Sequence, residues 1–214
     1  MDNKLYWSNK HKRYLAEDWI DKPTIFAQFV AKYFPQMGNL LDLGAGQGQD
    51  SRFFAENGYH VTATEYSETA IELARKTKPE LNLKYLVHDL NNKLPFKNET
   101  FDIVYSHLSI QFFDDVVTDK IFVEISRVLK KGGIIAIMVN TKDDPQMNMS
   151  KFLYDDLYEA SDGLVKRFYS TQSLSNFLSN KFQTILLDSN GETYKDEIKT
   201  LIRYIGKNKN NLHR

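Results

Sequence analysis

Short apolar runs alternate with longer segments of helical spacing along most of the chain. This alternation predicts βαβ units, in which helices connect the parallel strands of one sheet. Five runs are rich in Val, Ile, Leu or Tyr and are bounded by Gly, Asp or Asn, as expected of buried strands. They cover residues 40–43, 59–64, 83–88, 101–106 and 133–140.

Helices are predicted between and before these strands, because apolar residues recur there at spacings of three and four. Ser67 is placed to cap one of them, and Gly132 and Gly133 are predicted to end another after two lysines. The predicted helices cover residues 6–19, 22–34, 50–57, 67–78 and 116–131.

The carboxyl-terminal third has a different pattern. Residues 141–170 lack strand alternation and hold turn formers and aromatics, so we expect an inserted cap with one or two short helices. Two further strands, at 182–188 and 198–206, would complete the sheet as a pair that can be antiparallel. We therefore predict an α/β fold with one doubly wound, mostly parallel sheet over 37–206, an N-terminal helical lid over 1–36 and a flexible tail over 207–214.

The loop after the first strand carries three alternate glycines, Gly44, Gly46 and Gly48, and leads into a helix. Glycine allows a tight turn and the close approach of a ligand to the first helical amides. A dinucleotide-binding loop would have its third glycine at position 49, where Gln49 stands. Asp42, just before the loop, suits a cationic amine and not a pyrophosphate. The pocket is predicted to prefer a ligand with a positive group.

Acidic residues follow the next two strands as well. Glu65 lies about 20 residues after the glycines, near the spacing at which an acid binds a ribose diol. Asp89 follows the third strand, and the Leu90 amide beside it would complete a site for the adenine edge. Each acid alone could be a helix cap or a solvated strand end. Together with Asp42 they mark the carboxyl ends of consecutive strands, where open α/β sheets bind ligands.

These segments resemble the class I S-adenosylmethionine-dependent methyltransferases. The resemblance rests on LDLGAGQGQ with Glu65, HDL at 88–90, FDIVYSHLS at 101–109 and ISRVLKKGGIIAI at 125–137, in the family's order. It implies a Rossmann-like seven-stranded sheet and S-adenosylmethionine as cofactor, with the methionine part near Asp42, the ribose on Glu65 and the adenine on Asp89. Glu65 stands where many members have Asp. The cofactor site implied in this way comprises Asp42, Gly44, Ala45, Gly46, Gln47, Glu65, Tyr66, Asp89, Leu90 and Ser106.

Three other stretches are similar to the tellurite-resistance-like methyltransferases. They are GYHVTATEYS, the tract GLVKRFYS at 163–170 and DSNGETYKD before the last strand. This second resemblance implies a small-molecule methyl acceptor.

Several side chains could serve the acceptor. His107, after the fourth strand, could take or orient a proton, or could simply be satisfied by a backbone carbonyl. Tyr6, Trp7 and Tyr14 could form an aromatic lid that attracts a sulfonium cation, although such a stripe is more often packing.

Lys166 and Arg167 could hold an anionic acceptor, but a solvated surface pair is the expectation.

Composition removes several classes of function. The chain has no cysteine, which excludes thiolate metal sites and a cysteine nucleophile, and we expect no metal. Its formal charge is zero, so nucleic acid is an unlikely partner, and no stretch approaches the ~18 apolar residues of a membrane helix. We expect a cytoplasmic methyltransferase whose oligomeric state the sequence leaves open. A non-catalytic cofactor-binding module and an RNA methyltransferase stay as alternatives, the latter because basic residues prevail after Tyr194.

Overall fold

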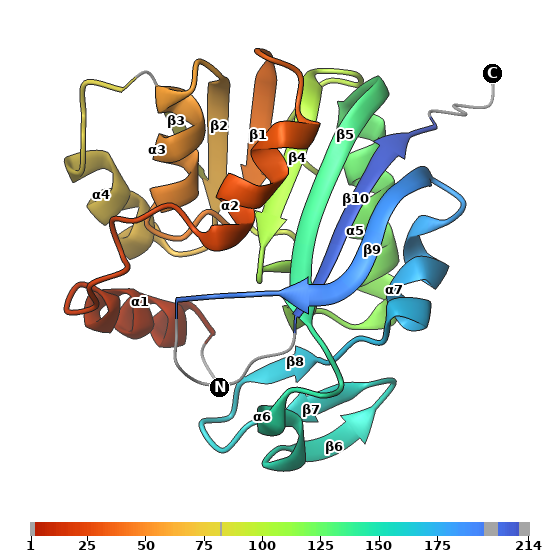
Figure 1. Ribbon diagram of the computed structural model, residues 1–214. Coiled ribbons are helices and arrows are strands. Elements are labelled where there is room, and N and C mark those ends of the chain that lie inside the picture. The colour runs from red at the N-terminus through yellow and green to blue at the C-terminus, as the bar shows by residue number, and fades with distance from the viewer. Residues whose placement is uncertain (1–2, 82, 195–200, 210–214) are drawn as a thin grey trace.

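The computed structural model describes residues 3–81, 83–194 and 201–209, and its centre is a seven-stranded sheet with the order β3-β2-β1-β4-β5-β10-β9 (Figure 1). Strands β1 to β5 are parallel, and β10 runs antiparallel to both β5 and β9. This arrangement confirms the predicted fold class. The strands are β1 (Asn39–Leu43), β2 (His60–Glu65), β3 (Lys84–Val87), β4 (Phe101–His107), β5 (Leu129–Asn140), β9 (Phe182–Gly191) and β10 (Leu201–Asn208).

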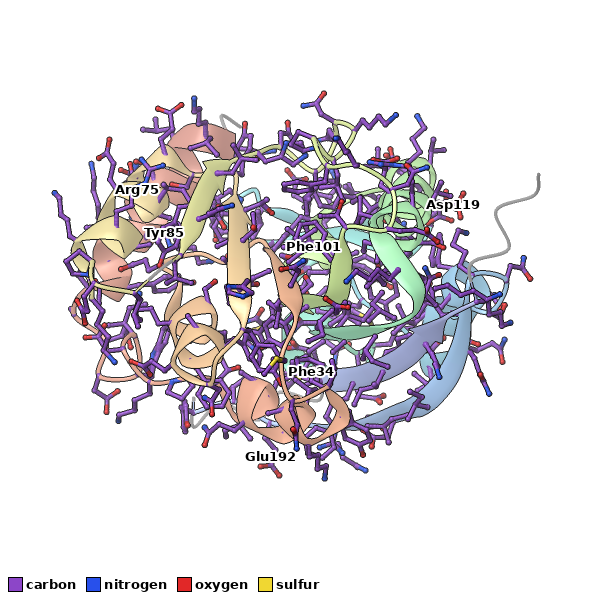
Figure 2. All side chains as sticks on the ribbon, turned by 90° about the horizontal axis from the view of Figure 1, so that it is seen from above. Phe34, Arg75, Tyr85, Phe101, Asp119 and Glu192 are labelled. Atoms are coloured by element: carbon purple, nitrogen blue, oxygen red, sulfur yellow. The ribbon has the colours of Figure 1, made fainter. Side chains whose placement is uncertain are left out.

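Helices cover both faces of the sheet, because neighbouring residues of a strand point to opposite sides. On β4, Ile103 packs in the cluster that includes α2 and α3, whereas Val104 packs in the cluster that includes α5 and α7. Figure 2 looks down on these layers, with Phe34 and Asp119 on opposite sides of the strands. The helices are α2 (Ile25–Val30) with the 3-10 turn η1 (Ala31–Tyr33), α3 (Gln49–Glu56), α4 (Glu68–Lys76), α5 (Asp115–Val128) and α7 (Thr171–Leu178).

The first helices are shorter than predicted. Helix α1 (Asn3–Tyr14) starts and ends earlier than expected. Helix α2 begins only after Thr24, whose side chain accepts a hydrogen bond from the Ala27 amide as an N-cap. Ser67 caps α4 as predicted, through the Ala70 amide. None of the helices in the described part of the chain is long and apolar enough to cross a membrane.

Two boundaries near β5 and β10 correct the sequence expectations. The helix predicted to reach residue 131 ends at Val128, and Leu129 already pairs with Phe101 in the sheet. Residues 207 and 208, expected in a flexible tail, belong to β10, and the side-chain amide of the buried Asn208 donates to the Leu129 carbonyl at 3.1 Å. Residues 198–200 of the predicted strand and 210–214 of the predicted tail lie outside the described residues.

The segment between β5 and α7 contains strands that the sequence pattern did not indicate. One short helix, α6 (Pro145–Asn148), precedes a three-stranded antiparallel sheet of β6 (Lys151–Tyr154), β7 (Leu157–Glu159) and β8 (Val165–Arg167). Runs of three or four residues are too short to show a period of two. We call α6 and this small sheet the cap. Figure 1 shows α1 and the cap at the same edge of the main sheet, where β4 and β5 end.

Helix α7 was not predicted either, although the sequence carries its start signal. The Ser170 side chain accepts from the Ser173 amide at 3.0 Å, and the Ser173 hydroxyl bonds back to Ser170. This reciprocal pair is a capping box with serine at the third helical position instead of the more usual Glu or Gln.

Candidate functional site

A cavity of about 720 Å³ opens at the carboxyl ends of the parallel strands, between the glycine loop, α1 and the cap. This volume is in the range of sites that bind small molecules and cofactors. Most residues predicted to bind a cofactor line it. They are Asp42, Gly44, Ala45, Gly46, Gln47, Glu65, Tyr66, Asp89 and Leu90.

At Gly44 and Gly46 of the glycine loop, a side chain would crowd a neighbouring residue. Gly44 has a φ of +69°, and a Cβ there would lie 2.3 Å from the Cβ of Ser109. Its amide donates to the Thr64 carbonyl at 2.8 Å, which ties the loop to β2. At Gly46 a Cβ would lie 3.2 Å from the ring of His11 on α1. Backbone therefore forms this wall, and a ligand can approach it closely.

Glu65 ends β2 with its carboxylate held by backbone amides. One oxygen accepts from the Gly46 amide and the other from the Ser67 amide, both at 2.9 Å. Burial raises the pKa of Glu65, and these amide bonds oppose the rise. The carboxylate is thus fixed at the cavity wall beside the loop.

Asp42 is 2% exposed, and its carboxylate accepts from the Ser51 hydroxyl at 2.6 Å. Burial raises the pKa of Asp42 to about 8, although the Ser51 bond lowers it, and the charges of Asp50 and Glu65 raise it further. No ion pair among the described residues reaches these three acids. A group of buried acids at a cavity wall favours a ligand with a positive charge.

The adenine side of the predicted site is more open. Asp89 follows β3, and one of its carboxylate oxygens accepts from the backbone and side chain of Asn91 at 2.9 and 2.8 Å. Ser106, in contrast, does not line the cavity. Its hydroxyl donates to the Leu43 carbonyl at 3.1 Å and shares a hydrogen bond with Ser109, so it supports the end of β1.

Sequence reasoning missed a buried polar cluster next to the loop. The carboxylate of Asp50 accepts from the Thr24 amide at 2.7 Å and from the Tyr105 hydroxyl at 2.6 Å. All three residues line the cavity. Asp50 in the first turn of a helix looked like an ordinary N-terminal acid. No local pattern links it to Thr24, which comes from a different helix.

His107 lies at the end of β4 and lines the cavity. Its ring stacks on Phe26, with centroids 6.3 Å apart, and its Nε2 is buried with no hydrogen-bond partner among the described residues. Burial lowers the pKa of His107, and the charge of Asp50 opposes this. The imidazole is therefore neutral near pH 7 and can accept a proton.

The comparisons with known proteins agree with this geometry. A family model for a methyltransferase domain matches residues 41–137, which include the glycine loop, the first two strand tips and His107. Residues 41–137 thus match a methyltransferase domain, and the chain is similar to S-adenosylmethionine-dependent methyltransferases.

Two curated relatives and a solved structure show the extent of the similarity. The malonyl-[acyl-carrier protein] O-methyltransferase of Enterobacter lignolyticus is 26% identical over 190 residues, or 88% of this chain and 70% of that protein. The probable S-adenosyl-L-methionine-dependent methyltransferase TehB of Haemophilus influenzae is 24% identical over 167 residues, or 76% of this chain and 56% of that protein, which confirms a weak relation to this group. The fold matches that of Burkholderia thailandensis 1,6-didemethyltoxoflavin-N1-methyltransferase, crystallised with 1,6-didemethyltoxoflavin and S-adenosylhomocysteine. The TM-score is 0.72 at 16% identity, covering 95% of this chain and 84% of that one.

The site of this methyltransferase fits S-adenosylmethionine, the cofactor of the family. A loop without side chains at Gly44 and Gly46 leaves room against the backbone. The buried carboxylates of Asp42 and Glu65 offer acceptors for a ligand that carries cationic groups and a diol.

Helix α1 covers the glycine loop of the methyltransferase. Of the three predicted lid residues, Trp7 and Tyr14 line the cavity, whereas the Tyr6 hydroxyl donates to Asp162 of the cap at 2.7 Å. The centre of the lid is His11, which the sequence reasoning missed. It is 6% exposed, its backbone carbonyl accepts from the Gln47 side chain at 2.7 Å, and burial lowers its pKa to about 4.

Lys166 and Arg167 are not the solvated surface pair that we expected. They are 7% and 2% exposed, because β8 packs against η2 (Ile110–Phe112) and the start of α5. Arg167 forms an ion pair with Asp115 and does not line the cavity. Lys166 does line it.

Proposed function

We propose that this chain transfers a methyl group from S-adenosylmethionine to a small-molecule nucleophile. The observation that carries the proposal is one continuous cavity with two differently built parts. Buried acids line its wall at the strand tips, and a neutral His107, α1 and the cap line the rest. This activity is consistent with the names of the two relatives. One is a malonyl-[acyl-carrier protein] O-methyltransferase, and the other is a probable S-adenosyl-L-methionine-dependent methyltransferase.

The part at the strand tips would hold the cofactor, which supplies a methyl group bound to a cationic sulfur. Asp42 faces the amine of the methionine part, and Glu65 faces the ribose hydroxyls. Asp89 and the Leu90 amide face the adenine edge. The loop backbone and the wall residues that surround these groups are Gly44, Ala45, Gly46, Gln47 and Tyr66.

The acceptor would lie between His107 and the cap. His107 Nε2, which has no hydrogen-bond partner among the described residues, would take the proton of an acceptor hydroxyl or amine. The acceptor atom would bond to the methyl carbon as the carbon–sulfur bond breaks, and S-adenosylhomocysteine would leave. An acceptor that is already deprotonated needs only orientation, because a sulfonium methyl group is already activated. Helix α1 keeps water away from the reacting atoms through Trp7, His11 and Tyr14.

The test has two steps. Calorimetry with S-adenosylhomocysteine should show binding to the wild type, and Glu65→Gln should weaken it by about 1 to 3 kcal/mol through the loss of charge-assisted hydrogen bonds. Glu72→Gln, on the exposed face of α4, is the matched control and should leave the affinity unchanged. Absence of any heat with the wild type would remove the proposal.

Labelled S-adenosylmethionine and a fraction of small molecules from cell extract then identify the product. We expect label in at least one compound that passes a filter of about 1 kDa, and less label with the Glu65→Gln protein at limiting cofactor. Label only in protein or RNA would contradict the small-molecule proposal. Binding without transfer to any compound would favour a cofactor-binding module.

A further inference from the structure

Charge is unevenly distributed along the cavity. The acids Asp42, Asp50 and Glu65 gather where β1, α3 and β2 meet the glycine loop. The cap contributes a cation instead, Lys166 on β8. A ligand that spans the cavity therefore meets this group of acids at one end and Lys166 at the other.

The orientation of Lys166 follows from the strand that carries it. Successive residues of a strand point to opposite faces, so Arg167 turns to Asp115 on α5 while Lys166 turns to the cavity. The Lys166 ammonium donates to the side-chain carbonyl of Gln146 on α6 and lies 4.7 Å from the centre of the Phe168 ring. With 7% of the residue exposed, this position is built into the wall and is not a surface lysine that happens to reach it.

The wall around Lys166 is polar as well. Gln146 lies beside it, and Asn140 at the end of β5 also lines the cavity. The Asn140 amide donates to the Gln111 side chain at 3.0 Å, which fixes both residues. Asp114 is the acid of this region that lines the cavity, and its carboxylate caps α5 by accepting from the Val117 amide at 2.8 Å.

An ammonium group in a cavity wall makes its strongest interactions as charge-assisted hydrogen bonds to anionic groups. The flat carboxylate group can accept from one ammonium and one side-chain amide together, which matches Lys166 and Gln146. We propose that the methyl acceptor carries a carboxylate and that Lys166 binds this carboxylate at the cap end of the cavity. The proposal rests on the proposed function, because it assigns the substrate class of the same site.

The test compares acceptor-like probes that differ only in charge. Benzoate and 4-hydroxybenzoate are titrated against benzamide and 4-hydroxybenzamide, by ligand-observed NMR on the complex with S-adenosylhomocysteine. We expect the wild type to bind the carboxylates about 10-fold tighter than the amides. Lys166→Met should abolish this preference, and Lys166→Arg should retain most of it because the charge remains.

Lys151→Met is the matched control, since Lys151 lies on β6 of the same small sheet but is exposed and does not line the cavity. It should bind both kinds of probe as the wild type does. Amides that bind the wild type as tightly as carboxylates would overturn the proposal, and so would carboxylate preference that survives Lys166→Met. Failure of every carboxylate to bind below about 10 mM would also overturn it.

The two proposals fail in different ways. If the wild type does not bind S-adenosylhomocysteine, the proposed function is wrong. If it binds this compound and shows no preference for carboxylates, only the substrate class is wrong. Thermal melting of each variant, with and without S-adenosylhomocysteine, tests whether the fold and the binding of this compound persist after the change at Lys166.

Discussion

The two ends of the cavity are built in opposite ways. At the glycine loop, the acids Asp42 and Glu65 lie at the ends of neighbouring strands. The backbone amides of Gly46 and Ser67 hold the Glu65 carboxylate, with nitrogen–oxygen distances of 2.9 Å. At the other end, the last residue of β5 and two elements of the cap, α6 and β8, each contribute one polar side chain: Asn140, Gln146 and Lys166. The first end is a property of the parallel sheet, whereas the second depends on how an insertion folds over it. A cofactor site can thus stay constant while the acceptor site varies with the insertion.

Gly44→Ala should have the largest effect, and it tests how rigid the loop end is. Its new Cβ would lie 2.3 Å from that of Ser109 at a φ of +69°. We expect the free energy of unfolding to fall by about 4 kcal/mol from overlap plus backbone strain. Urea denaturation measures it. Gly58→Ala is the control, because Gly58 has a φ of +91° but no atom lies within 4 Å of an added Cβ. We expect this variant to lose only about 1 to 2 kcal/mol of unfolding free energy. Equal losses would show that overlap at the loop does not matter.

His107→Asn tests the boundary between the two ends. If the neutral imidazole accepts a proton, turnover of a hydroxyl or amine acceptor should fall about 100-fold. The dissociation constant of S-adenosylhomocysteine should change less than about threefold, because the proposed function assigns His107 to the acceptor and not to the cofactor. Steady-state kinetics and calorimetry together decide this. Parallel losses in both measurements would assign His107 to packing against Phe26.

Asp42→Asn should separate stability from binding at the loop end. The pKa of about 8 means that the folded, ligand-free protein holds a proton on Asp42 that the unfolded chain releases above about pH 4. Stability is therefore lost as the pH rises from about 4 to about 8, and Asp42→Asn should raise the unfolding free energy near pH 8 by about 1 to 2 kcal/mol.

The same variant should bind S-adenosylhomocysteine about 10-fold more weakly near pH 8, because the ionised carboxylate pairs with the ligand's amine. In the wild type the affinity should rise from about pH 6 to about pH 8 as Asp42 ionises, and the variant should lose much of this rise. A wild-type affinity independent of pH over this range would remove Asp42 from the amine site.

Tyr6→Phe should have the smallest effect, and it tests whether α1 and the cap act together. It removes the hydrogen bond that the Tyr6 hydroxyl donates to Asp162 and the one that it accepts from Lys10, and it leaves the ring in place. We expect the unfolding free energy to change by less than about 1 kcal/mol, because the contact is partly exposed. Hydrogen exchange should nonetheless quicken in α1 and leave β1 and β4 unchanged. Unchanged exchange in α1 would show that the cap does not restrain it.

The sequence predicted the sheet and the loop end well, because both depend on local signals. Asp42 and Glu65 lie at the carboxyl ends of β1 and β2, and Asp89 comes shortly after β3, so position along the chain fixes position at the sheet edge. The burial of His11 and Asp50 was not predicted. A histidine in a polar helix and an acid at the start of a helix give no local signal that another segment packs on them.

The cap was predicted least accurately. Its strands have three or four residues, too few for periodicity, and the burial of Lys166 and Arg167 comes from η2 and α5 and not from their own neighbours. The length of α5 was overestimated for a related reason. Leu129 continues the helical apolar stripe, and its pairing with Phe101 in the sheet overrides that pattern.

The position of α1 has a practical consequence for work with the purified protein. The helix begins at Asn3, which itself lines the cavity, whereas β10 ends at Asn208 on the opposite edge of the sheet (Figure 1). An affinity tag fused ahead of Asn3 would start beside the cavity, whereas the end of β10 at Asn208 does not line it.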